Sequence, residues 1–309
     1  MSRYPKTTLI GSGAVGSAIT YALHKKGYPV VSIISRTGAS AKQLAKKVHT
    51  KRVSTVSQDI APDTALLLLG VNDDALETVI DEVASIKKLK FRNMFIIHFS
   101  GVQTSTLFDV LKRKGATVAS VHPIQSFPKS APFPQLVGRL RGCFYGIEGE
   151  DDALEKAEKL VGDLGGKIVV VPRELKPLYH AACVFASNYF VVLLNAISEL
   201  AAAAKLYISW TELFGPMMTA TMENTIRSGP VQALTGPIVR NDITTVRAHL
   251  KALEASAPQF VPLYTMCALE VARIAKASGR ITPDAYDGML KQFKTFIHSQ
   301  PVRHLKVKQ

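Results

Sequence analysis

The feature that most constrains this chain is a glycine-rich turn directly after its first apolar run. Residues 7–11 form a short β-branched and aliphatic segment, and Gly11 to Gly16 fit the spacing G-x-G-x-x-G. Residues 17–26 then have helical spacing, which ends before Gly27. Strand, glycine turn and helix in this order predict a nucleotide-binding βαβ unit, because Gly13 lets backbone amides approach a pyrophosphate at the helix N-terminus. A glycine turn that holds no ligand is the alternative.

Further short apolar runs follow, and they are near-continuous rather than alternating, which is typical of strands buried on both faces. Helix-like segments, including a basic one over residues 39–48, separate most of them. The predicted fold class is therefore α/β, with a Rossmann-like, mainly parallel sheet and helices on each side. The runs lie at residues 28–34, 65–71, 94–99, 117–121, 143–147 and 167–171.

The chain changes character after residue 172. Its 309 residues favour two domains, and from residue 175 to about 296 the sequence shows helical periods and no convincing strand. Gly-Pro pairs at 215–216, 229–230 and 236–237 predict helix ends. We predict a dinucleotide-binding Rossmann-like domain over residues 1–172. An all-helical domain for substrate binding and dimerisation should follow over 173–309, with a frayed basic tail from residue 303.

The positive charge of the chain is unevenly distributed. The formal net charge is +14, and no acidic residue precedes Asp59. Such a segment attracts anions, which leaves nucleic acid and a phosphorylated cofactor as candidates. Aromatic side chains on which bases stack are scarce among these charges, so we expect no nucleic-acid partner. The basic residues are Arg3, Lys6, Lys25, Lys26, Arg36, Lys42, Lys46, Lys47, Lys51 and Arg52.

The end of the second strand decides which nicotinamide cofactor fits. Ser35-Arg36-Thr37 stands where an NAD enzyme places a carboxylate for the ribose 2′-hydroxyl. The Arg36 guanidinium instead suits a 2′-phosphate, so we predict NADP(H); a solvated loop arginine is the alternative. Val71 and Asn72, at a later strand end, should border the nicotinamide. The predicted cofactor-binding residues are Gly11, Ser12, Gly13, Ala14, Val15, Gly16, Ser35, Arg36, Thr37, Val71 and Asn72.

Histidine and serine side chains follow two further predicted strands. His98 and Ser100 follow one strand, and His122 and Ser126 follow the next. Ligands of such sheets lie beyond the carboxyl ends of the strands, and pockets gather a few convergent polar groups. We predict that these four residues bind substrate; a purely structural role for each histidine is the alternative.

A polar stripe is predicted on the first helix of the helical domain. Pro177 is tolerated only in a first turn, so the helix should begin near Lys176. At about 100° per residue, Lys176, His180 and Ser187 fall within about 40° of one another, with Asn188 beside them. An ammonium or imidazole can stabilise and protonate a developing alkoxide, so Lys176, His180 and Asn188 are predicted as catalytic and Ser187 as substrate-binding. A polar network without chemistry is the alternative.

A turn later in the helical domain presents an arginine. Gly236-Pro237 precedes Arg240 and Asp242. An arginine fork suits the carboxylate of a 2-oxo acid, and Asp242 could orient it, so both are predicted to bind substrate. A surface ion pair is the alternative.

These motifs together resemble a bacterial family that joins a Rossmann-like domain to a helical C-terminal domain long catalogued as of unknown function. The resemblance covers nearly the whole chain. It departs from the family at Asn241, where glycine is usual, and at Phe99, where a small polar residue is expected. The motifs are the glycine turn, His98-x-Ser100-Gly101, His122-Pro123-x-x-Ser126-Phe127, and residues 176–189 and 234–242.

The resemblance implies an NADP-dependent reductase, similar in layout to pyrroline-5-carboxylate reductase and 6-phosphogluconate-type dehydrogenases. Some members serve as alternative ketopantoate reductases, so reduction of a small 2-oxo acid between the domains, ketopantoate to pantoate first, is the leading expectation. The similar hydroxyacid dehydrogenases place asparagine four residues after their lysine, where His180 stands here. Whether Lys176 or His180 donates the proton therefore stays open. The alternatives are an imine reductase and a non-catalytic NADP(H)-responsive binding protein.

The longest apolar stretch, residues 181–206, reaches membrane-spanning length, but polar side chains that are costly in hydrocarbon interrupt it. We predict a buried helix of a cytoplasmic homodimer without a secretory signal or a membrane span. No metal site is predicted, because the cysteines lack ligand spacing and are interpreted as core thiols. The interrupting residues are Ser187, Asn188, Asn195, Ser198 and Glu199, and the cysteines are Cys143, Cys183 and Cys267.

Overall fold

The structure is a computed structural model that describes residues 3–298. The chain divides into two compact units, Met1–Asn188 and Tyr189–Gln309. The sheet ends with β8 (Lys167–Val170), close to the boundary predicted at residue 172, but the division falls later. It does so because helix α7 (Lys176–Val184) places Lys176 in the interior of the first unit. The basic tail predicted from residue 303 lies outside the described residues.

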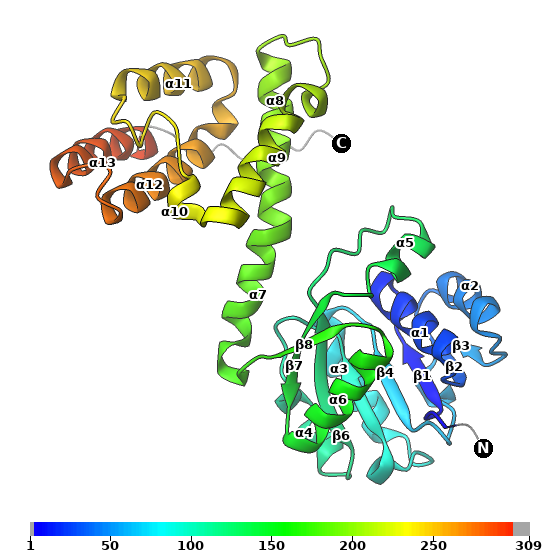
Figure 1. Cartoon of the computed structure of the whole chain (residues 1–309). Coiled ribbons are helices and arrows are strands. Elements are labelled where there is room, and N and C mark those ends of the chain that lie inside the picture. Colours follow the sequence, from blue (N-terminus) through cyan, green and yellow to red (C-terminus); the bar gives the residue numbers. More distant parts are fainter. Residues whose placement is uncertain (1–2, 299–309) are drawn as a thin grey trace. The chain divides into compact units, whose positions relative to one another are not determined.

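The first unit contains one eight-stranded sheet in the order β3-β2-β1-β4-β5-β6-β7-β8 (Figure 1). All pairings are parallel except that of β6 with β7, which confirms the predicted mainly parallel sheet. Every predicted strand is present, and the two-residue β3 is the one that the sequence did not indicate. The strands are β1 (Thr7–Ile10), β2 (Val30–Ile34), β3 (Val53–Ser54), β4 (Leu66–Leu69), β5 (Phe95–His98), β6 (Thr117–Pro123), β7 (Phe144–Gly149) and β8.

Helices cover both faces of this sheet, because successive strand residues point to opposite sides (Figure 1). Leu9 and Leu68 pack under one layer, whereas Ile10 and Leu67 pack under the other. The first layer holds α1 (Ala14–Lys26), α2 (Gly38–Val48), α5 (Phe133–Gly138) and α6 (Asp151–Asp163), and the second holds α3 (Asp73–Ser85) and α4 (Asp109–Lys112). Short 3₁₀ turns lie at Ser57–Asp59, Phe91–Asn93, Ser105–Phe108, Arg173–Leu175 and Pro258–Phe260.

The helix predicted to begin near Lys176 does begin there, with Pro177 in its first turn. It does not continue as a regular α-helix, because a π-helical turn (Phe185–Tyr189) separates α7 from α8 (Phe190–Ala203). A π turn changes the angle between successive residues, so Ser187 and Asn188 do not follow the α-helical spacing from which the polar stripe is predicted. Lys176 is buried, whereas Asn188 is exposed.

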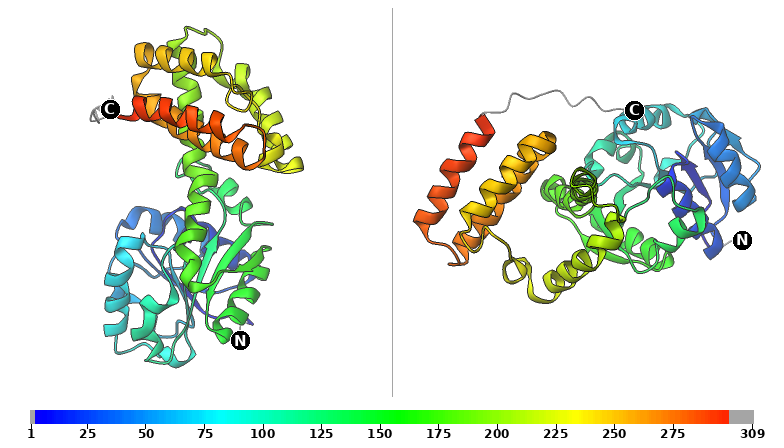
Figure 2. Two further views of the ribbon diagram at one scale, coloured as in Figure 1. Left: turned by 90° about the vertical axis from the view of Figure 1, so that its left-hand side faces the viewer. Right: turned by 90° about the horizontal axis from the view of Figure 1, so that it is seen from above.

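The second unit is helical throughout its described residues. Its core lies among α11, α12 and α13, and the last two helices lie side by side (Figure 2). Pro216 does not end a helix as predicted but lies inside α9, whereas Gly229, with φ +81°, does follow a helix end. The helices are α8, α9 (Trp210–Ser228), α10 (Pro230–Ala233), α11 (Ile243–Ser256), α12 (Val261–Ala277) and α13 (Pro283–His298).

The apolar stretch at 181–206 is not the buried helix that the sequence predicts. Val191 is 62% exposed and most side chains of α8 are accessible. Among the described residues, the helical run Arg173–Ala203 is long and apolar enough to cross a membrane by length and composition. An 18-residue stretch within it has a mean hydropathy of 1.7, and 6% of that stretch is buried. The core-thiol interpretation also fails for Cys267, which is exposed, while Cys143 and Cys183 are half-buried.

Candidate active site

The glycine turn packs tightly against the end of β4. Gly11 has φ +90°, and a Cβ atom there would lie 2.5 Å from the carbonyl carbon of Gly70. A Cβ on Gly16 would lie 2.6 Å from the Gly11 carbonyl oxygen, so neither glycine can be enlarged without backbone movement. Gly13 differs, because a Cβ there meets only the Gly70 oxygen at 3.7 Å. The tight glycines shape the turn, and the open one leaves room beside the N-terminus of α1.

The surroundings of this turn fit a dinucleotide phosphate. The first turn of α1 contains no acidic residue, so nothing there opposes an anion at the helix N-terminus. β1 pairs with both β2 and β4, which makes its carboxyl end the point where the strand order reverses. Ser12 is buried and its hydroxyl lies 2.6 Å from that of Ser40, a residue that the sequence did not single out.

The residues predicted to select the cofactor lie at the end of β2. Ser35 is buried, whereas Arg36 and Thr37 are exposed directly before α2. Arg36 makes no hydrogen bond or ion pair with the residues that the structure describes, so its guanidinium is available to an anion. Along the neighbouring strand end, Val71 is half-buried and Asn72 precedes α3 as its exposed N-cap residue.

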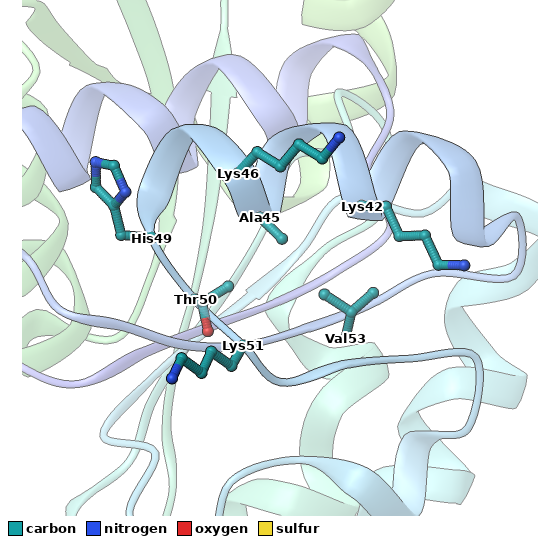
Figure 3. A pocket seen from close by; sticks show the side chains of 7 residues that line it. All are labelled: Lys42, Ala45, Lys46, His49, Thr50, Lys51 and Val53. Carbon is teal, nitrogen blue, oxygen red and sulfur yellow. The ribbon is translucent and has the colours of Figure 1, made fainter.

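Part of the excess positive charge lines a hollow elsewhere on the first unit. The hollow has a volume of about 460 Å³ and lies between α2 and the segment leading into β3 (Figure 3). Its lining contains no acidic residue, and its three lysines make no ion pair with described residues. The lining residues are Lys42, Ala45, Lys46, His49, Thr50, Lys51 and Val53. Some of the positive charge that precedes Asp59 therefore lies at this hollow and not at the glycine turn.

Lys176 is fully buried and its ammonium group has a complete set of partners. It donates to the Ser100 carbonyl oxygen at 3.1 Å, to the Ser120 hydroxyl at 2.5 Å and to the Gln103 carbonyl oxygen. Burial lowers the pKa of Lys176 to about 8, against the opposing effect of the Glu148 and Asp73 charges. An ammonium has three hydrogens, so all of them are used within the protein. Lys176 thereby fixes the loop after β5.

His122, Tyr179 and His180 form a half-buried cluster where β6 meets α7. The Tyr179 hydroxyl lies 2.7 Å from Nδ1 of His122, and the rings of His122 and His180 are 5.6 Å apart between centroids. Two glycines make room for these side chains. A Cβ on Gly101 would lie 2.2 Å from the His180 ring, and one on Gly146 would lie 2.4 Å from the Tyr179 hydroxyl. The sequence indicated both histidines but not Tyr179, although it directly precedes His180.

Two members of the cluster, His122 and Tyr179, are neutral near neutral pH. Burial, with the nearby charges of His180 and Lys176, lowers the pKa of His122 to about 4. Burial also raises the pKa of Tyr179, so its hydroxyl stays protonated. Glu148, a buried carboxylate on β7, accepts hydrogen bonds from the Ser105 amide and hydroxyl and pairs with Arg173 at 2.9 Å. The cluster itself therefore presents hydrogen-bond donors rather than carboxylates.

The other predicted strand-end residues do not join this cluster. His98 is fully buried and stacks on Phe108 with ring centroids 4.8 Å apart, and neither of its ring nitrogens has a hydrogen-bond partner within residues 3–298. Burial lowers its pKa well below the usual value, so it is a neutral core side chain. The Ser100 hydroxyl accepts from the amides of Val102 and Gln103, which shapes the loop, and Ser126 is exposed.

The predicted residues near and beyond the π turn are placed as follows. The Ser187 hydroxyl lies 2.9 Å from the Cys183 carbonyl oxygen and 2.8 Å from Oδ1 of Asn188, and its single hydrogen is donated to one of these acceptors at a time. In the second unit, Asp242 does not orient Arg240 by a hydrogen bond but caps α11, where it accepts from the amide and hydroxyl of Thr245. Arg240 is exposed, and Asn241 adopts φ +55°, the left-handed conformation expected for the residue that replaces glycine.

Within residues 3–298, no group of three or more His, Cys, Asp or Glu side chains is placed to hold a metal ion. The residues that could hold a cofactor are those of the glycine turn and the end of β2.

Several solved structures share this fold. A Bacteroides fragilis protein named as an NADP oxidoreductase is 21% identical, with a TM-score of 0.72 over 87% of this chain and 98% of that protein. An imine reductase from Myxococcus stipitatus in complex with NADP⁺ is 17% identical, with a TM-score of 0.65 over 93% and 100% of the two chains. A reductive aminase from Aspergillus terreus in complex with NADPH is 18% identical, with a TM-score of 0.62 over 94% and 99%.

No curated protein sequence matches the chain. Two domain families do match it. Residues 3–123 match a Rossmann-like domain, and residues 143–271 match a domain of unknown function, DUF2520. The chain is therefore built as a Rossmann-like domain followed by a DUF2520 domain, the arrangement of the family that its sequence motifs resemble.

Proposed function

We propose that the protein is an NADPH-dependent reductase of a small carbonyl compound, with conversion of ketopantoate to pantoate as the first candidate reaction. Bound NADPH would supply the hydride, held by the glycine turn and by Arg36 at its 2′-phosphate. The observation that carries the proposal is the His122–Tyr179–His180 cluster, which lies at strand ends of the sheet that carries the glycine turn. The nicotinamide cofactors named for the structurally similar proteins support it.

The charges of the cluster favour a carbonyl over an imine. Hydride addition to a carbonyl leaves negative charge on oxygen, which neutral donors and a nearby buried ammonium stabilise. An iminium substrate is cationic and would be stabilised by a carboxylate, but Glu148 is occupied by Ser105 and Arg173. An imine remains the second candidate substrate, because two of the similar structures are an imine reductase and a reductive aminase.

Among the predicted catalytic residues, His180 is our candidate for the proton donor. Lys176 has no free hydrogen and is buried, so we assign it the role of fixing the loop after β5 and of supplying positive charge. His180 is half-buried and a histidine suits proton transfer near neutral pH. Asn188 and Ser187, which belong to the same unit as His180, are proposed to contact the substrate.

The test is NADPH consumption by the purified protein with a panel of ketopantoate, other 2-oxo acids, a plain ketone and a cyclic imine. We expect turnover of a 2-oxo acid, and a loss of kcat of about a hundredfold or more in His180→Gln. Turnover of the imine alone would refute the carbonyl assignment. Binding of NADPH without turnover of any compound would favour a non-catalytic NADP(H)-responsive binding protein.

We also propose that the protein is a cytoplasmic homodimer whose second unit provides the contact. Large apolar side chains of α8 and α9 are exposed, among them Val191 at 62%, Met217 at 61% and Ile226 at 79%. A second copy suits this surface better than a membrane, because Glu199 lies on α8, paired with Asn195 and Gln259, and a carboxylate is costly in hydrocarbon. Light scattering of the detergent-free protein should give twice the mass of the chain.

A further inference from the structure

We propose that Tyr179 holds His122 in a single tautomer, with the ring proton on Nε2, so that His122 presents an N–H donor to the substrate. Tyr179 is then a positioning residue, which acts through His122. The tautomer itself follows from the contacts of this cluster. Its use in the reaction rests on the proposed function.

The direction of the hydrogen bond follows from the chemistry of the two groups. The Tyr179 oxygen and His122 Nδ1 are 2.7 Å apart, and both side chains are neutral near pH 7. If Nδ1 carried the proton, it would donate to the phenol, and the phenol hydrogen would need another acceptor. The Cys183 side chain also forms a hydrogen bond with this hydroxyl, but as an acceptor sulfur is weaker than an imidazole nitrogen. Donation from the phenol to an unprotonated Nδ1 therefore makes the stronger bond.

The geometry around the pair keeps this bond in place. The Tyr179 hydroxyl occupies a slot that exists because residue 146 is glycine, since a Cβ there would come within 2.4 Å of the hydroxyl oxygen. His180 packs against Gly101 on the other side and lies edge-on to His122, with ring planes 84° apart. These contacts leave His122 little freedom to turn its ring over.

Nε2 of His122 is the atom left for a ligand. It has no hydrogen-bond partner among the described residues, and it is not among their buried unpaired side-chain atoms. A neutral imidazole with one nitrogen occupied as an acceptor must carry its proton on the other. The cluster then offers an uncharged donor beside His180, which could hold a carbonyl oxygen while charge develops on it.

The direct test is ¹⁵N NMR of the histidine rings in the intact protein, with the His122 signals assigned through His122→Asn. The two tautomers of a neutral imidazole differ in which nitrogen bears the proton, and long-range ¹H–¹⁵N correlations distinguish them. We expect the Nε2–H form in the unsubstituted protein at pH 7. A dominant Nδ1–H form would overturn the proposal without any variant being needed.

Tyr179→Phe supplies the second readout. Loss of the donor removes a bond made to the neutral ring, so the His122 titration midpoint should rise by about one pH unit and the two tautomers should mix. With a reducible substrate, kcat should fall about tenfold while KM changes little. An unchanged midpoint and tautomer in Tyr179→Phe would overturn the proposal.

Tyr21→Phe is the matched control, because the Tyr21 ring packs on Phe133 and its hydroxyl has no hydrogen bond among the described residues. It should change neither the His122 signals nor kcat. The NMR measurement needs no turnover, so its result is separate from the substrate assay. An Nε2–H tautomer in a protein that reduces no compound of the panel would refute the proposed function alone. An Nδ1–H tautomer in a protein that does reduce a carbonyl compound would refute this inference alone.

Discussion

Of two sets of glycines in the first unit, one leaves space for neighbouring backbone and the other leaves space for side chains. At the turn after β1, Gly11 and Gly16 let backbone approach backbone, and a methyl group on either would meet main-chain atoms. Gly101, in the loop after β5, leaves space for the His180 ring, and Gly146, within β7, leaves space for the Tyr179 hydroxyl. A methyl group on either glycine would meet these side chains. The first set therefore defines the shape of the fold, whereas the second positions chemical groups.

The largest effect should come from the first set. Gly11→Ala places a side chain at φ +90° and 2.5 Å from the carbonyl carbon of Gly70, so we expect a loss of about 3–5 kcal/mol in the free energy of unfolding. The measurement is urea unfolding followed by circular dichroism. Gly38→Ala is the matched control, because a Cβ there meets nothing within 4 Å and the residue begins α2, so it should stabilise slightly. Equal stability of the two variants would remove the distinction between the glycine sets.

The second set should affect activity more than stability. In Gly101→Ala the new methyl group overlaps the His180 ring, and a half-buried side chain can move aside at a cost of about 1 kcal/mol. Displacement of the proton donor should lower kcat about a hundredfold with the substrate found by the panel assay. Gly138→Ala, where a Cβ meets nothing, is the control and should keep full activity. A Gly101→Ala enzyme with normal kcat would argue against His180 as the donor.

The sequence predicted the first set and not the second, and the reason is physical. The glycine turn is local, because six consecutive residues between a strand and a helix carry its whole pattern. Gly101 and His180 come from segments far apart in the chain, and nothing local reports that they meet. The same limit explains His98, which a strand-end rule placed at the site and the fold placed in the core. The exposure of α8 likewise follows from tertiary packing, which a hydropathy pattern does not contain.

Lys176 both shapes the fold, because it fixes the loop after β5, and supplies a chemical group, its buried ammonium. Its folded-state pKa of about 8 lies below the usual value of 10.5, so the folded protein binds this proton less tightly than the unfolded chain does. The free energy of unfolding should therefore rise with pH between these two values. From about pH 7.5 to about pH 9.5, the free energy of unfolding of the unsubstituted protein should rise by about 2 kcal/mol relative to that of Lys176→Met. A difference that does not change with pH would show that Lys176 is not desolvated.

The smallest expected effect concerns Arg36, which lies at the end of β2 and is proposed to bind the cofactor together with the glycine turn. The Arg36 guanidinium has no partner in the part of the chain that the structure describes. If it binds the 2′-phosphate of NADPH, Arg36→Ala loses a charge-assisted contact, and NADPH affinity should fall about tenfold to a hundredfold. NADH lacks this phosphate, so its affinity should not change. Fluorescence titration with both cofactors measures the effect, and Lys51→Ala, in the basic hollow beside α2, is the control for a general loss of positive charge. If Arg36→Ala and Lys51→Ala weaken NADPH binding equally, the preference for NADPH over NADH comes from the positive charge of the whole basic segment rather than from Arg36. The glycine turn would then bind the dinucleotide with no specific contact to its 2′-phosphate.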